Sequence, residues 1–158
     1  MQIYSRSLRL LAALAITLTP NYVDAQAPLA TQGRWSSVIT TSVNPVGAAA
    51  LPDGKVLMWS AYDRYSFAEG VSAQTLTGLF DPATGLTTEQ LVTNTAHDMF
   101  CSGTSFLPDG RLLVTGGDTA GRSSIYNPGT ASWTAGGDMN IARGYQGQVT
   151  IDDGRAFV

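Results

Sequence analysis

The sequence predicts an all-β protein built from repeated units. After residue 25 the chain consists of short hydrophobic runs separated by Gly, Pro, Asn and Asp, and it has no long apolar pattern of helical period. An Asp-Gly pair, followed by Lys or Arg (Lys55, Arg111, Arg155) and a hydrophobic run, occurs three times, starting at Asp53, Asp109 and Asp153. These starts are 56 and 44 residues apart, spacings typical of kelch-type β-propeller blades.

Residues 1–25 are predicted to form a secretory signal peptide. Two arginines precede an uncharged apolar run over 10–18, and small residues occupy the positions read by signal peptidase before a cut after Ala25. The run is too short to anchor the chain in a membrane. A buried N-terminal helix is the alternative, which Pro20 disfavours because it ends the run. We therefore expect a secreted, extracellular protein whose folded part is 26–158.

Other elements recur in phase with the Asp-Gly repeat. Residues 79–82 and 125–128 are matching strand ends that run into a Pro turn, and Trp133 follows the second of them. Each blade should therefore have an inner strand, the Asp-Gly strand, a strand ending before Pro, and an outer strand carrying Trp. Inner strands are expected to run through 47–51, 99–107 and 144–151. The blades should cover about 44–93 and 98–136, and 33–38, around Trp35, should be an outer strand of a further blade.

Two and a half blades cannot close a propeller, because repeat folds bury a continuous core only by stacking several units. The chain also ends at Val158, inside a predicted strand. We therefore expect 26–158 to be the N-terminal part of a propeller domain in a longer protein. A small β-sandwich is the alternative, disfavoured because the repeat phase recurs at several positions.

The composition excludes several kinds of site. The net charge is −3, so no broad basic surface is available for nucleic acid. With one Cys and one His, the chain cannot form an internal disulfide, a Cys-based zinc site, or any site needing two of its own imidazoles. A lone Cys is unusual in a secreted protein, and composition alone favours a buried thiol that packs as a small hydrophobe.

Two segments stand near the start of predicted inner strands, which line the axis of a propeller. The first runs His97-Asp98-Met99-Phe100-Cys101-Ser102-Gly103 and the second ends Arg143-Gly144-Tyr145-Gln146. With the kelch elements around them, over about 33–158, they resemble the galactose oxidase family, the fungal mononuclear copper-radical oxidases related to glyoxal oxidase. The resemblance implies a seven-bladed kelch propeller, of which about two and a half blades are present.

The resemblance also implies a mechanism. Cys101 and Tyr145 would be joined by a thioether bond formed with copper and dioxygen, and Tyr145 would be a copper ligand. The cross-linked ring would serve as a radical cofactor beside copper, so that a primary alcohol loses two electrons in one turnover. Dioxygen would then be reduced to hydrogen peroxide. On this interpretation Cys101 is half of a cofactor rather than an inert thiol.

The same resemblance predicts roles for further residues. Phe67 matches a Phe that borders the family's substrate pocket, with simple core packing as the alternative. His97 matches a position that is not a copper ligand, so hydrogen bonding in a turn is expected of it. Ser102 stands where the family usually has Pro, which affects the local turn. The remaining copper ligands, a Tyr and two His, are expected outside these residues, so the chain alone should be inactive.

Gly144 and Gln146 favour the galactose oxidase branch over glyoxal oxidase-like members, which tend to carry an aromatic residue in place of the Gly. We expect a monomer that uses copper, takes a small primary alcohol or galactose-type carbohydrate with O2, and binds neither nucleic acid nor membrane. Two alternatives stay open. The protein could be a kelch interaction module without catalysis, or an aldehyde oxidase with the same copper chemistry.

Overall fold

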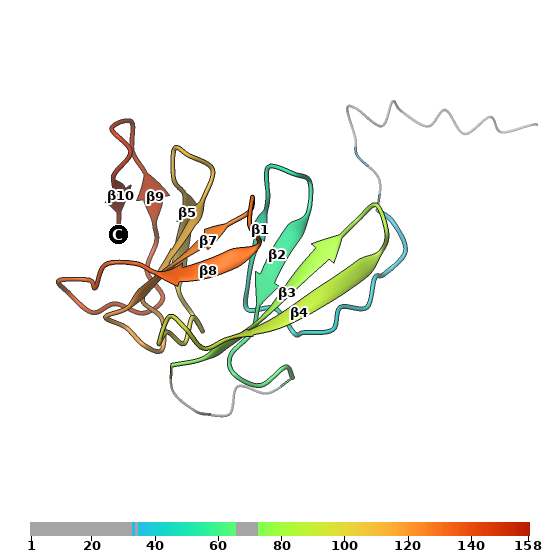
Figure 1. Cartoon of the computed structure of the whole chain (residues 1–158), viewed down its shortest axis with the longest axis horizontal. Helices are drawn as coiled ribbons and strands as arrows, with labels where there is room; N and C mark the ends of the chain where they lie inside the picture. The colour runs from blue at the N-terminus through green and yellow to red at the C-terminus, as the bar shows by residue number, and fades with distance from the viewer. Residues whose placement is uncertain (1–32, 34, 66–72) are drawn as a thin grey trace, which may run out of the picture. The chain divides into compact units, whose positions relative to one another are not determined.

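The computed structural model describes residues 33, 35–65 and 73–158, and every regular element in this part of the chain is a β-strand (Figure 1). The all-β prediction is therefore confirmed over these residues. The chain divides into two units, 1–38 and 39–158, and all the strands lie in the second. The predicted signal peptide and Phe67 lie outside the described residues. Within the described residues, no helix has the length and apolar character needed to span a membrane.

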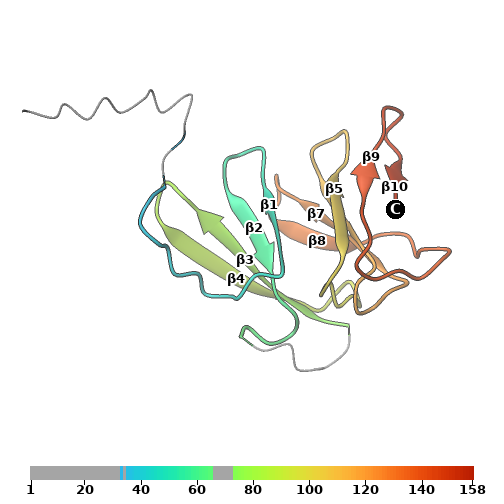
Figure 2. The same ribbon diagram turned by 180° about the vertical axis from the view of Figure 1, so that it is seen from behind.

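Two four-stranded antiparallel sheets follow one another along the chain, each with its strands in sequence order (Figures 1 and 2). A two-stranded pair comes after them. These sheets correspond to the two predicted blades and the start of a third, while closure into a seven-bladed ring stays a prediction. The first sheet contains β1 (Gly47–Ala50), β2 (Val56–Trp59), β3 (Thr75–Asp81) and β4 (Leu86–Val92); the second contains β5 (Gly103–Phe106), β6 (Leu112–Thr115), β7 (Ser123–Asn127) and β8 (Ser132–Ala135); the pair is β9 (Val149–Thr150) and β10 (Ala156–Phe157).

The Asp-Gly repeat forms the same tight turn in all three sheets. Between β5 and β6, the Asp109 carboxylate accepts the Arg111 N–H at 3.1 Å and pairs with the Arg111 Nε at 2.7 Å. Gly110 has a φ of 82°, in the left-handed region that suits glycine. The hydrogen bonds from Arg111 hold the pKa of Asp109 below its ordinary value. The same contacts recur at Asp53 with Lys55 and at Asp153 with Arg155, so one local rule builds each inner hairpin.

The main core draws its side chains from both four-stranded sheets. Trp133, in the predicted outer strand, is 2% exposed and packs against Tyr126 with 5.1 Å between ring centroids. Each large apolar side chain that is fully buried contributes about 1.5–3 kcal/mol. Because the two sheets share this cluster, they stabilise each other as neighbouring blades do. Its buried members are Leu51, Leu57, Trp59, Val92, Met99, Leu112, Val114, Tyr126 and Trp133.

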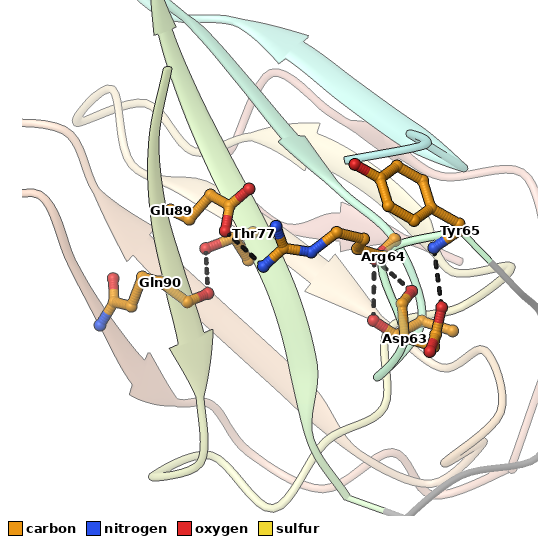
Figure 3. A network of polar contacts seen from close by, with 8 residues as sticks. Asp63, Arg64, Tyr65, Thr77, Glu89 and Gln90 are labelled. Carbon is orange, nitrogen blue, oxygen red and sulfur yellow. Dashed lines mark hydrogen bonds and ion pairs between the residues drawn. The ribbon is translucent and has the colours of Figure 1, made fainter. Parts of the chain in front are cut away.

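A polar network connects the segment after β2 to strand β4 (Figure 3). The Arg64 Nη2 lies 2.8 Å from the Glu89 Oε2, and the Tyr65 N–H donates to the Asp63 carboxylate at 2.8 Å. The Arg64 side chain is 44% exposed, and such a pair contributes at most about 1 kcal/mol. The network therefore orients the segment that leads toward Phe67 more than it stabilises the sheet.

Three strand predictions were wrong in their bounds. Strand β5 begins at Gly103, the last residue of the first motif segment, and β9 begins at Val149. Cys101 and Tyr145 therefore lie in loops before these strands rather than within them. Both loops contain a residue of positive φ, which a strand does not accommodate. The outer strand predicted at 33–38 is not formed at the described residues 33 and 35–38, and Trp35 is 99% exposed. A strand exists only by pairing with a neighbour, and no described strand pairs there.

Candidate functional site

Cys101 lies in a tight turn immediately before β5. The Ser102 N–H donates to the Met99 carbonyl at 3.3 Å, and Cys101 has a φ of 63°. A positive φ at the third turn residue normally selects Gly or Asn, so a Cys there holds a strained backbone. Ser102 supplies the N–H that closes this turn, and a Pro at that position could not donate it.

Tyr145 lies in the loop before β9. It is hydrogen-bonded to the backbone of Cys101, although 44 positions separate the two residues in the sequence. Its backbone N–H donates to the Cys101 carbonyl at 2.9 Å, and its φ is 57°. The Tyr145 side chain is 84% exposed, while Cys101 is half-buried. A small hollow of about 100 Å³ is lined by Phe100, Cys101, Gly117, Asp118, Gly144 and Tyr145. The two residues that the sequence pairs are therefore adjacent in space.

The side chains of Cys101 and Tyr145 also interact. Hydrogen bonding and the Coulombic interaction with the Cys101 side chain raise the pKa of the Tyr145 phenol. The two side chains therefore act on each other electrostatically.

The double glycine after β6 holds both loops. The Gly117 N–H donates to the Arg143 carbonyl at 3.0 Å, and the Asp118 N–H donates to the Phe100 carbonyl at 2.9 Å. A Cβ on Gly117 would overlap the Phe100 oxygen, and a Cβ on Gly116 would overlap the Arg143 oxygen. Only glycine lets the backbones approach this closely, so this turn brings the Cys101 and Tyr145 loops together.

Two glutamines fasten the Tyr145 loop to the second sheet. The Gln146 Nε2 donates to the Thr115 carbonyl at 2.5 Å, and the Gln148 Nε2 donates to the Ser105 hydroxyl at 2.9 Å. The Thr115 hydroxyl donates to the Gln148 Oε1 at 2.5 Å. Sequence reasoning missed Gln148. The signal for it is the alternation of Gln146 and Gln148, which places both side chains on one side of an extended chain.

His97 is fully buried between β6 and β7. Its Nε2 lies 2.7 Å from the Gly116 carbonyl and its Nδ1 lies 2.8 Å from the Ser124 hydroxyl. Because a carbonyl only accepts, Nε2 carries the proton and Nδ1 accepts from Ser124 in the neutral ring. The expected hydrogen-bonding role is confirmed, but the partners are Gly116 directly after β6 and Ser124 in β7 rather than groups of a local turn. Burial lowers the pKa of His97.

Acidification is expected to destabilise the fold through His97. Its folded pKa lies below the ordinary 6.5, so the unfolded chain binds more protons as the pH falls below about 6.5 and stability is lost. Thermal midpoints of the full-length protein between pH 7.5 and 5.5 should fall more steeply for wild type than for His97→Gln. Burial raises the pKa of Asp98, which changes stability in the opposite direction as the pH falls. Both proteins contain Asp98, so the difference between their slopes cancels its effect. Equal slopes for both proteins would contradict this assignment.

The described residues do not assemble a metal site by themselves. Among the described residues there is no group of three or more His, Cys, Asp or Glu side chains placed to hold a metal ion. Tyr145 offers one exposed phenol oxygen beside Cys101, and a single anionic oxygen ligand of this kind suits Cu(II) in a mixed N,O site. The predicted pocket role of Phe67 cannot be placed, because that residue lies outside the described part.

Comparison with known proteins gives partial matches. No family model matches the sequence. Two galactose oxidases of Gibberella zeae are 44% identical to it over 132 residues, which is 83% of this chain and 19% of each relative. A solved structure described as a novel fungal alcohol oxidase with catalytic diversity among the AA5 family, in complex with copper, is 35% identical with a TM-score of 0.69. That match covers 78% of this chain and 27% of the other, so this chain spans about a fifth of its curated relatives' length.

Proposed function

From the homology of this chain to part of galactose oxidase and the AA5 copper-radical oxidases, at 44% identity over 83% of its residues, we propose that it is part of a secreted copper-radical oxidase. The whole protein oxidises primary alcohols of galactose type to aldehydes and reduces O2 to H2O2. The observation that carries the proposal is the pairing of Cys101 with Tyr145, which share a 2.9 Å backbone hydrogen bond and line one small hollow.

Within this mechanism the chain supplies the protein half of the radical cofactor. Cys101 and Tyr145 form a thioether, and the Tyr145 oxygen is one of the copper ligands. Tyr145 would hold copper through this oxygen, and the bound copper would supply one-electron redox chemistry beside the cross-linked ring. Phe67 borders the substrate. The Gly116–Gly117 turn and the two glutamines hold the Tyr145 loop against the second sheet, which keeps the phenol beside the sulfur.

The full-length protein, produced with copper, is expected to release H2O2 when given galactose or another primary alcohol, and to be secreted with Gln26 as its first residue. A peroxide assay across alcohols and aldehydes measures the first, and N-terminal sequencing the second. Preference for aldehydes would replace the proposal by a glyoxal oxidase-like activity, since Gly144 and Gln146 favour alcohols only through the resemblance. Absence of peroxide with every substrate, together with no downstream Tyr and His ligands, would identify a kelch interaction module.

A further inference from the structure

One buried hydroxyl connects the first sheet to the Cys101 loop. Thr75 is the first residue of β3 and is fully buried. Its Oγ1 donates to the His97 carbonyl at 3.0 Å and accepts the Met99 N–H at 2.8 Å. Both backbone groups belong to the segment that runs into Cys101, so one side chain satisfies a buried acceptor and a buried donor of that segment.

The same segment is held from the opposite side by the second sheet. The His97 ring is hydrogen-bonded to the Gly116 carbonyl and the Ser124 hydroxyl, at 2.7 and 2.8 Å. Met99 is fully buried in the core, with its N–H bound by Thr75 and its carbonyl accepting the Ser102 N–H at 3.3 Å. Met99 is therefore the fixed end of the turn in which Cys101 stands.

Fixing Met99 has a consequence for the sulfur two residues later. The Cys101 backbone has a positive φ, a conformation that persists only where its surroundings impose it. If the Met99 N–H loses its acceptor, the turn can relax and the sulfur spends less time against the Tyr145 ring. Reactions between two held groups depend steeply on such placement, and an error of about 1 Å can cost about a hundredfold in rate.

We propose that Thr75 is a positioning residue for the Cys101–Tyr145 cross-link, acting through Met99 on the turn that carries Cys101. The proposal rests on the proposed function. In the cross-linking step, a bond forms between the Cys101 sulfur and a Tyr145 ring carbon, while the S–H and ring C–H bonds break. The two protons and two electrons go to dioxygen, which becomes H2O2, so that no copper is consumed in the balance.

The test compares Thr75→Val, which keeps the shape and removes the hydroxyl, with Thr75→Ser, which keeps the hydroxyl. Full-length protein is prepared copper-free, Cu(II) is added in air, and the loss of two hydrogen masses is followed by intact-mass spectrometry. Thr75→Val should cross-link at least about tenfold more slowly than wild type. The cross-linking rate of Thr75→Ser should stay within about threefold of wild type. If Thr75 only filled space, keeping the hydroxyl would not be needed for this rescue.

Thr77 provides a matched control on the same strand and face. It is also buried, and its Oγ1 donates to the Gln90 carbonyl at 3.0 Å within the first sheet (Figure 3), whereas no hydrogen bond joins it to the segment before Cys101 in the described part of the chain. Thr77→Val should therefore cross-link at the wild-type rate. Wild-type kinetics in folded Thr75→Val, or equal slowing in Thr77→Val, would overturn the positioning role.

If Thr75→Val does not fold, hydrogen exchange of copper-free wild type replaces it: the Met99 amide should exchange as slowly as the core strand amides, and fast exchange would refute the proposal. Failure of the proposed function can be distinguished from failure of the positioning role. In the first case the wild type itself would show no mass loss after treatment with copper and oxygen.

Discussion

Cys101→Ser is expected to abolish both the thioether and alcohol oxidation in the full-length protein. The hydroxyl that replaces the thiol keeps the small volume of the side chain, but it does not form the carbon–sulfur bond to the Tyr145 ring. After treatment with copper and oxygen, wild type should lose the mass of two hydrogens and gain a tyrosyl-radical absorption. The variant should show neither change, and its peroxide release should fall to background.

Ser102→Ala is the neighbouring control. It keeps the backbone N–H that donates to the Met99 carbonyl, so the turn around Cys101 stays closed. Its cross-linking should match wild type. An intact Cys101 thiol in wild type after copper and oxygen treatment would end the cross-link hypothesis, whatever the variants do.

Gly117→Ala is expected to destabilise the full-length protein by about 2–4 kcal/mol. The added Cβ would overlap the Phe100 carbonyl oxygen, and the φ of 99° at this position is itself unfavourable for a side chain. Relieving the overlap requires the Phe100–Cys101 backbone to move away from Gly117. Denaturation midpoints measure the loss, and the rate of thioether formation should fall with it.

Gly121→Ala is a matched control in the same connection between β6 and β7. A Cβ there meets nothing within 4 Å, and its φ lies outside the left-handed region. Its stability should stay within about 0.5 kcal/mol of wild type. Similar losses in both variants would mean that the double glycine acts only through chain flexibility and not by permitting close approach.

Local patterns predicted the sheets well. The Asp-Gly turns are encoded within a few residues, because Asp109, Gly110 and Arg111 make their contacts with each other and with nearby backbone. The strand ends before Pro and the buried Trp133 followed the same repeat phase. Residues 33–38 did not form the predicted strand where they are described, since a strand also needs a partner that a local pattern does not supply.

The sequence by itself determined the all-β class and the four-stranded unit, and the family resemblance predicted a link between Cys101 and Tyr145, which the structure shows to be neighbours. Only the tertiary structure showed that both residues lie in loops and have positive φ. It also showed that Gly117 and Thr75 form hydrogen bonds with the backbone segments that precede them. The physical reason is distance along the chain. Thr75 and Met99 are 24 positions apart, and contacts of that range follow from how two sheets pack rather than from any local periodicity.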